Sequence, residues 1–289
     1  MKLARQNLRT PGPTPIPEDI VQAMSSPMVN HRGPEFHDLI IEATAKLKQV
    51  FMTQNDLYIL TASGTGALEA AIVNTLSPGD KVIGASAGSF GDRFCDAAEA
   101  YGAEVKRLTF EWGEPVDPEA IRRALRDDPE IKAVLITHNE TSTGVTHDVE
   151  TIARIVKDEF NKLLLVDAVS SLGCIPVPVD GWNCDMVGTA SQKGFMIPPG
   201  LSFISVSKAA WQAQKTAKMP RFYFDLAAAR RYLERGQTPW TPNLSSLYGL
   251  KVALDKMLGE GLENVFDRHA SIGEFTRAGV ASLGLKLLC

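Results

Sequence analysis

Residues 163–173 read LLLVDAVSSLG, in which four apolar residues come directly before Asp167. An uninterrupted apolar run of this kind is typical of a parallel strand that is buried on both faces. A carboxylate at the end of such a strand is costly unless a cation or an N–H group meets it. We therefore expect a buried strand that carries Asp167 to the edge of a parallel sheet, where it serves either structure or function.

The same pattern repeats along the chain on both sides of this strand. Short apolar runs bounded by turn residues alternate with amphipathic segments, which favours a mostly parallel sheet with helices on both faces, an α/β/α sandwich. Strands are predicted over 56–63, 81–86, 104–110, 131–138, 162–169 and 201–207. Helices are predicted over 18–24, 38–52, 64–76, 91–103, 117–127, 149–160, near 225–235, and over most of the chain after that.

Composition limits the classes of function. The chain has 289 residues, 44% hydrophobic and 22% charged, as in a globular protein of one large domain with an appendage or of two domains. The formal net charge is -4 and no dense Lys/Arg block occurs, so we expect no nucleic-acid partner and no membrane partner. The first residues, MKLARQNLRTPGPTP, lack the apolar core of a signal peptide, which favours a cytoplasmic protein.

Cysteine and histidine spacing predicts no metal site. The four cysteines form no C-x-x-C pair, and the five histidines show no ligand spacing such as H-E-x-x-H. We expect reduced thiols that are mostly buried.

Ligands of open parallel sheets bind beyond the carboxyl ends of the strands. Ser63, Gly64 and Thr65 lie between a predicted strand and a predicted helix, so their N–H groups and hydroxyls suit a phosphate; a plain Ser-capped helix is the alternative. The stretch lacks the third glycine of G-x-G-x-x-G, so a nucleotide fits poorly. Thr141 lies in THNETSTG after another predicted strand, where a polar turn is equally compatible.

Lys193 lies in TASQKGFMIPPG, residues 189–200, between a polar pair and a turn rich in Gly and Pro. A nucleophilic lysine needs a fixed position and surroundings that favour its neutral amine, whereas most lysines are exposed cations. A phosphate cradle, a buried carboxylate and such a lysine together are the requirements of pyridoxal 5′-phosphate: an anion site, a partner for its pyridine nitrogen, and an amine for its aldehyde. The three sites therefore predict this cofactor.

These motifs also resemble those of a known family, the class V, fold-type I aminotransferases of the alanine–glyoxylate and serine–glyoxylate type. The resemblance extends from the arm TPGPTPIP to the end of the chain, and it rests on SGTGALEAA, HNETSTGV, LLLVDAVSSLG, SQKGFMIPPGLSF and TPNLSSLYGL, in this order. It implies the aspartate-aminotransferase-like large domain of pyridoxal-phosphate-dependent transferases with a truncated small domain. The implied division is an N-terminal arm (1–20), a large cofactor-binding domain (21–255), and a linker helix with the start of the small domain (256–289).

The resemblance also implies roles for individual residues. Lys193 would be the Schiff-base lysine and then the acid and base of the reaction, and Asp167 would pair with the pyridinium nitrogen. Val169 would pack against the ring, and the phosphate would be held by Ser63, Gly64, Thr65 and Gln192.

Further implied positions surround the cofactor. Phe90 falls where relatives usually stack a tryptophan, and Thr141 would sit beside the 3′-oxygen or the ring edge. Relatives are homodimers, and Thr241 matches a threonine that reaches the phosphate of the partner subunit. Gly12 matches a segment that lines the substrate pocket. The arginine that clamps the substrate carboxylate in relatives belongs to the small domain, beyond the LGLKLLC with which this sequence stops.

The expected activity is transfer of the amino group of a small amino acid, alanine or serine, to glyoxylate or another small 2-oxo acid such as pyruvate. One alternative is a cysteine desulfurase or lyase of the same superfamily, but those relatives carry a histidine before the lysine and a later catalytic cysteine. Here Gln192 precedes Lys193 and the only later cysteine is Cys289. Another alternative is a truncated, non-catalytic subunit that binds pyridoxal phosphate.

Overall fold

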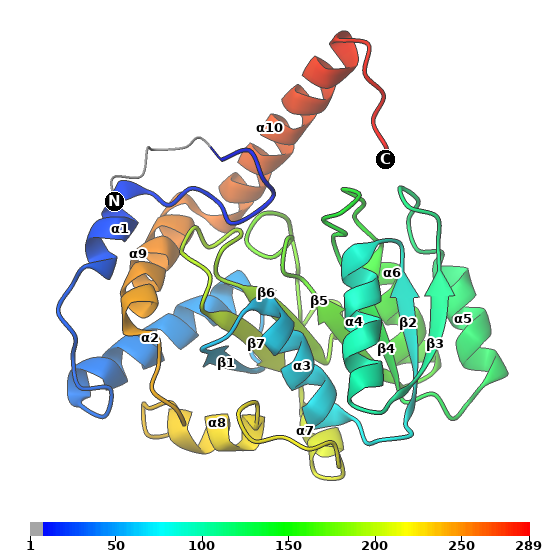
Figure 1. Ribbon diagram of the computed structural model, residues 1–289, viewed down its shortest axis with the longest axis horizontal. Coiled ribbons are helices and arrows are strands. Elements are labelled where there is room, and N and C mark those ends of the chain that lie inside the picture. The colour runs from blue at the N-terminus through cyan, green and yellow to red at the C-terminus, as the bar shows by residue number, and fades with distance from the viewer. Residues whose placement is uncertain (1–7) are drawn as a thin grey trace.

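The computed structural model describes residues 8–289, so the first part of the predicted arm, residues 1–7, lies outside the described residues. A seven-stranded sheet forms the centre of the molecule, with strand order β1-β7-β6-β5-β4-β2-β3 (Figure 1). The strands are β1 (Asp56–Leu60), β2 (Lys81–Ser86), β3 (Glu104–Thr109), β4 (Ala133–Thr137), β5 (Leu163–Asp167), β6 (Met186–Ala190) and β7 (Ser202–Val206).

Strand direction confirms the predicted mostly parallel sheet. Every pair from β6 to β3 is parallel, whereas β7 runs antiparallel to both β6 and β1. Because two antiparallel pairings follow one another, β1 has the same direction as β6, and its carboxyl end lies at the same edge of the sheet. In the centre, Asp167 of β5 lies in register between Thr137 of β4 and Gly188 of β6.

Strand β6 was not predicted from the sequence. Its five residues, MVGTA, contain Gly188 and two other small or polar residues, which give a weak strand signal. Gly188 is explained by packing, because a Cβ atom there would lie 3.2 Å from the Cβ of Ala67. The close approach of the helix that contains Ala67 therefore favours glycine over a better strand former.

Helices cover both faces of the sheet, as predicted. Their bounds are α1 (Glu18–Met24), α2 (Pro34–Val50), α3 (Gly64–Thr75), α4 (Ser89–Ala100), α5 (Pro118–Asp127), α6 (Val149–Ala153) with the π-helix η1 (Arg154–Glu159), α7 (Lys208–Gln214), α8 (Leu226–Leu233), α9 (Leu244–Glu260) and α10 (Leu262–Ser282). Alternate residues of β4 point to opposite faces of the sheet and belong to two separate buried clusters. Ala133 and Leu135 pack in the cluster with α3, α4, α7 and α8. Val134 and Ile136 pack in the cluster with α2, α5, α6 and α9. None of the helices within residues 8–289 combines the length and the apolar character needed to cross a membrane.

Both ends of the described chain lie on the side where the parallel strands end. The segment before α1 crosses the base of α10, and α10 extends away from the body of the molecule (Figure 1). An ion pair of 2.7 Å between Asp19 Oδ2 and Lys256 Nζ joins α1 to α9. The predicted boundary at residue 256 falls inside α9, Leu244–Glu260.

Candidate active site

The predicted residues from several strand ends come together at one edge of the sheet. Asp167 is the last residue of β5, Lys193 lies in the loop between β6 and β7, and Ser63 is the N-cap of α3, three residues after the end of β1. This is the carboxyl edge, where the ends of parallel strands leave a crevice for ligands.

Asp167 is a buried carboxylate without a cation in direct contact within residues 8–289. The residue is 3% exposed, and its Oδ1 accepts a hydrogen bond of 2.8 Å from the Val169 N–H. Burial raises the pKa of Asp167 to about 6; the Val169 N–H, Lys193 and Arg93 oppose this rise, and the charge of Glu140 adds to it. Such a carboxylate gains from a positively charged hydrogen-bond donor.

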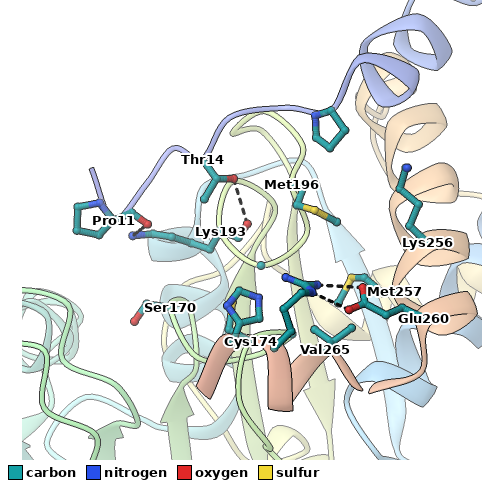
Figure 2. A pocket seen from close by; sticks show the side chains of 15 residues that line it. Pro11, Thr14, Ser170, Cys174, Lys193, Met196, Lys256, Met257, Glu260 and Val265 are labelled. Atoms are coloured by element: carbon teal, nitrogen blue, oxygen red, sulfur yellow. Dashed lines mark hydrogen bonds and ion pairs between the residues drawn. The ribbon is translucent and has the colours of Figure 1, made fainter. Parts of the chain in front are cut away.

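Lys193 is half-buried beneath the N-terminal arm. Its Nζ donates to the carbonyl oxygen of Pro11 at 3.4 Å, and the Thr14 hydroxyl donates to the Lys193 carbonyl at 3.2 Å (Figure 2). Burial lowers the pKa of Lys193, while the charges of Asp167 and Cys174 act in the opposite direction. A lowered pKa increases the fraction of neutral amine, which is the nucleophilic form.

The amino end of α3 is open to an anion. The Ser63 side chain makes no capping hydrogen bond, and within residues 8–289 no acceptor meets the N–H groups of Gly64 and Thr65. A Cβ atom on Gly64 would lie 2.7 Å from Val169 Cγ2, so glycine lets α3 approach the strand end that carries Asp167. Unpaired N–H groups at a helix start bind phosphate groups well.

Gln192 adds a second polar group that lacks a partner. Its Oε1 atom is buried with no hydrogen-bond partner among the described residues, although its backbone carbonyl accepts from the Thr14 N–H at 3.1 Å. A buried amide oxygen without a donor is unfavourable. This group, the open start of α3 and the carboxylate of Asp167 all fit a ligand with a phosphate and a protonated ring nitrogen.

The other predicted positions lie at different distances from this centre. Phe90 is in the first turn of α4, and its ring faces the guanidinium of Arg93 at 4.8 Å. Thr141 is half-buried in the loop after β4. Thr241 is exposed before α9 and makes no recorded hydrogen bond within the described chain. The structure therefore brings Phe90 and Thr141 toward the strand ends but leaves Thr241 on the surface.

A cavity of about 480 Å³ opens beside Lys193. Figure 2 shows Pro11 and Thr14 of the arm on one side of it and Met257, Glu260 and Val265 on the other. Arg268 also lines the cavity, and its Nε and Nη2 atoms donate to the two carboxylate oxygens of Glu260 at 2.6 and 2.9 Å.

Sequence reasoning missed two residues that organise the site. Thr14 ties the arm to the lysine loop, and its place in a Pro-rich segment gave no sign of a partner 179 residues away. Glu140 is completely buried between the loop after β4 and the start of α4. Its signal was present, because it is the one carboxylate in THNETSTG, a stretch singled out as a strand end.

The fold is that of the fold-type I aminotransferases, and comparison with known proteins makes the assignment narrower. The chain belongs to the aminotransferase class-V family, whose pattern matches residues 7–288. It is 46% identical to the soluble hydrogenase small subunit of Synechococcus sp. over 283 residues, which are 97% of this chain and 73% of that protein.

Two further relatives carry aminotransferase names. The serine–glyoxylate aminotransferase of Methylorubrum extorquens is 41% identical over 291 residues, covering 98% of this chain and 72% of the relative. The crystal structure of alanine–glyoxylate aminotransferase from Nostoc sp. superposes with a TM-score of 0.94 at 33% identity, covering 99% of this chain and 76% of that one. These likenesses support the fold over its whole described length.

Proposed function

We propose that this protein is a pyridoxal-phosphate-dependent aminotransferase that moves the amino group of alanine or serine to glyoxylate or another small 2-oxo acid. The observation that carries the proposal is the meeting of three features at one sheet edge: the amine of Lys193, the buried carboxylate of Asp167 and the open amino end of α3. The family depends on pyridoxal phosphate, and each feature suits a different part of that cofactor.

The residues of this chain would hold the cofactor at three points. The N–H groups of Gly64 and Thr65 would bind the phosphate, together with the Ser63 hydroxyl and the Gln192 side chain. The Asp167 carboxylate would accept a hydrogen bond from the ring nitrogen and keep a proton there. Val169 lies next to Gly64 and would contact one face of the ring, with Phe90 on the other and Thr141 at its edge.

Lys193 would act first as a nucleophile and then as an acid and base. When bound, the cofactor supplies an aldehyde and an electron-withdrawing ring. The neutral Nζ of Lys193 would hold the cofactor through its aldehyde, and in the reaction the same atom would take the proton from the substrate α-carbon. The arm limits the movement of this side chain, because Gly12 lies against its last three atoms.

The cavity beside Lys193 suits a small substrate. Its volume of about 480 Å³ is bounded by the arm segment of Gly12 and by apolar side chains such as Met196, Met257 and Val265. Arg268 already uses its Nε–Nη2 edge for a bidentate ion pair with Glu260, so this edge would have to leave Glu260 before it could bind a substrate carboxylate. We propose that residues 1–20 are an N-terminal arm, that residues 21–255 are the large cofactor-binding domain, and that residues 256–289 are a linker helix and the start of the small domain.

We also propose a homodimer. Phe222 is 77% exposed. Its ring centroid lies 4.8 Å from that of Trp240, and the ring of Tyr223 stacks on Trp240 at 5.8 Å. We call these three side chains the aromatic surface; Thr241 follows it directly in the sequence. Exposed aromatic side chains that gather in one place are typical of protein interfaces, so a second copy would both cover them and receive Thr241.

The test is spectroscopic and uses a lysine control. Pyridoxal phosphate is added to the wild-type protein, to Lys193→Ala and to Lys256→Ala, whose lysine lines the same cavity but pairs with Asp19. We expect the wild type and Lys256→Ala to acquire the visible band of a lysine-bound cofactor, and L-alanine or L-serine with glyoxylate to shift it and form product. Lys193→Ala should lack this band.

Other outcomes identify the alternatives. A wild-type band that no amino acid shifts would indicate a subunit that binds the cofactor without catalysis. Sulfide release from L-cysteine would indicate a desulfurase. The absence of any band in the wild type would overturn the proposed cofactor.

A further inference from the structure

Glu140 is a fully buried carboxylate that contacts no cation within residues 8–289. It is 0% exposed, and both of its oxygens accept hydrogen bonds from N–H and O–H groups only. Oε2 accepts from the N–H groups of Phe90 and Gly91 at 3.1 and 3.0 Å. Oε1 accepts from the Ser142 N–H at 3.1 Å and from the Ser142 hydroxyl at 2.6 Å.

These bonds join two segments that are distant in the sequence. Phe90 and Gly91 form the first turn of α4, whereas Ser142 belongs to the loop after β4, and the carboxylate spans 50 residues to reach Phe90. A further bond of 3.1 Å runs from the Ser89 N–H to the Ser142 hydroxyl, so the same loop also holds the residue that begins α4.

This capping arrangement differs from that of other helices in the described chain. The N-cap residues Asp117, Asp148, Ser207, Asp225 and Asn243 each cap their own helix with a side chain. The N-cap of α4 is Gly88, which has no side chain, and a Cβ atom there would lie 2.6 Å from Glu140 Cγ and 2.5 Å from Ser142 Oγ. The start of α4 thus depends on the β4 loop for its capping and for its position.

Two of the connected residues are ones that we propose to contact the cofactor, Phe90 on one face of the ring and Thr141 at its edge. Phe90 donates to Glu140 through its backbone, and Thr141 lies between Glu140 and Ser142 in the sequence. We propose that Glu140 is a positioning residue, whose carboxylate fixes the separation of the Phe90 ring from Thr141 and so shapes the slot for the pyridine ring. This inference rests on the proposed function, because it assigns Glu140 a role at the same site.

The electrostatics agree with this role. A carboxylate at a helix start is stabilised by the helix dipole and by charge-assisted hydrogen bonds, which compensates for its burial. The negative charge at the start of α4 is therefore supplied by the protein itself, as the Glu140 carboxylate. The start of α3 has no such group within the described chain. Of these two helix starts, this contrast leaves that of α3 available to the phosphate.

The test is Glu140→Gln, which keeps the size and shape of the side chain. Both oxygens of Glu140 face donors, so the amide NH₂ group of glutamine would have to point at an N–H or O–H group whichever way it is turned. We expect the Kd for pyridoxal phosphate to rise by roughly 10-fold to 100-fold, the range for losing one hydrogen bond to a charged group. The visible circular dichroism of the bound cofactor should also change, because the ring changes its orientation.

The matched control is Asp185→Asn. Asp185 is equally buried, at 1% exposed, and it also accepts from a backbone N–H, that of Leu164, and from a hydroxyl, that of Ser207. Unlike Glu140 it also forms a buried ion pair, with Lys157, so its substitution sets an upper bound on the effect of lost stability alone. It precedes β6, so it lies at the opposite edge of the sheet from the site. This variant should lower thermal stability without changing the Kd for pyridoxal phosphate or the circular dichroism of the bound cofactor.

Three results would overturn the inference. The first is that Glu140→Gln binds pyridoxal phosphate with wild-type affinity and an unchanged spectrum. The second is that Asp185→Asn also loses affinity, and that in both variants the loss of affinity is proportional to the loss of stability. If Glu140→Gln does not fold, the milder Ser142→Ala decides, since it removes only the hydroxyl donor; a wild-type Kd and spectrum in that variant would overturn the inference. Wild-type protein that does not bind pyridoxal phosphate would instead refute the proposed function itself.

Discussion

Gly12 lies directly against the side chain of Lys193. A Cβ atom on Gly12 would come within 2.7 Å of Lys193 Cδ, 2.8 Å of Cε and 2.9 Å of Nζ. The arm therefore acts as one wall of the lysine site. It can approach Lys193 this closely because Gly12 has no side chain.

Gly12→Ala should move the lysine without unfolding the protein. The added methyl group has to displace either the arm or the Lys193 side chain, and a displacement of about 1 Å at a reacting group can lower the rate about 100-fold. The measurements are the rate of amino transfer and the thermal midpoint, with Gly279→Ala as the control because nothing lies within 4 Å of a Cβ atom at Gly279. Equal rates in the two variants would show that the arm does not restrain Lys193.

The cofactor-free protein should lose stability as the pH rises through the range in which Asp167 ionises. Its pKa is raised in the folded protein to about 6, so the neutral form is favoured by folding, and ionisation destabilises the fold as the pH rises from about 4 to about 6. At neutral pH this cost amounts to roughly 3 kcal/mol, which Asp167→Asn would not incur.

Urea unfolding across this pH range measures the effect. Without cofactor, Asp167→Asn should be more stable than the wild type at pH 7 and similar to it at pH 4. Added pyridoxal phosphate should stabilise the wild type more than the variant, because only the wild type offers a negative charge to the ring nitrogen. Parallel pH profiles for the two proteins would contradict this account of Asp167.

His138 should make the fold sensitive to acid. It is buried edge-on against Trp182 at 5.2 Å, and burial lowers its pKa to about 4. Folding therefore favours neutral His138, and stability falls as the pH drops from about 6.5 to about 4, by roughly 3 kcal/mol. His138→Phe keeps the aromatic contact and should show a shallower decline in urea unfolding; an unchanged slope would assign the acid sensitivity to other groups.

The aromatic surface should control association. Phe222→Asp places a charge where we expect the second copy to cover apolar rings, and this should convert a dimer into monomers. Phe275→Asp is the matched control, because Phe275 is 82% exposed but lies on α10. Light scattering of both variants distinguishes the surfaces, and a dimer that only Phe275→Asp dissociates would place the interface on α10 instead.

The sequence was sufficient to predict the fold class and the meeting of the candidate residues at one edge, because strand ends in a parallel sheet share that edge. Asp167 after its apolar run, and Ser63 before its helix, could be assigned to that edge from local pattern alone. Strand β6 was missed because the residue at position 188 is determined by close packing against Ala67, which favours glycine, and glycine has a low strand propensity.

The contacts of Glu140 and Thr14 could not have been predicted by the same reasoning. Each makes its important hydrogen bonds to a segment far away in the sequence, at Phe90 and at the lysine loop. Local patterns carry information on periodicity, capping and turns, but a pairing between distant loops depends on the assembled sheet.

The long sequence separation between the arm and the lysine loop also limits how early these parts of the fold can form during synthesis. Thr14 bonds to Gln192, and β1 pairs with β7, so neither the arm nor β1 has its partner until the ribosome has synthesised about two thirds of the 289 residues. During that time β1 has no partner strand, and Leu57 and Tyr58, which are buried in the folded protein, are not yet covered by it; unpaired strands of this kind tend to associate with other chains. Slow translation of the middle of the chain would therefore lengthen the period in which β1 has no partner strand.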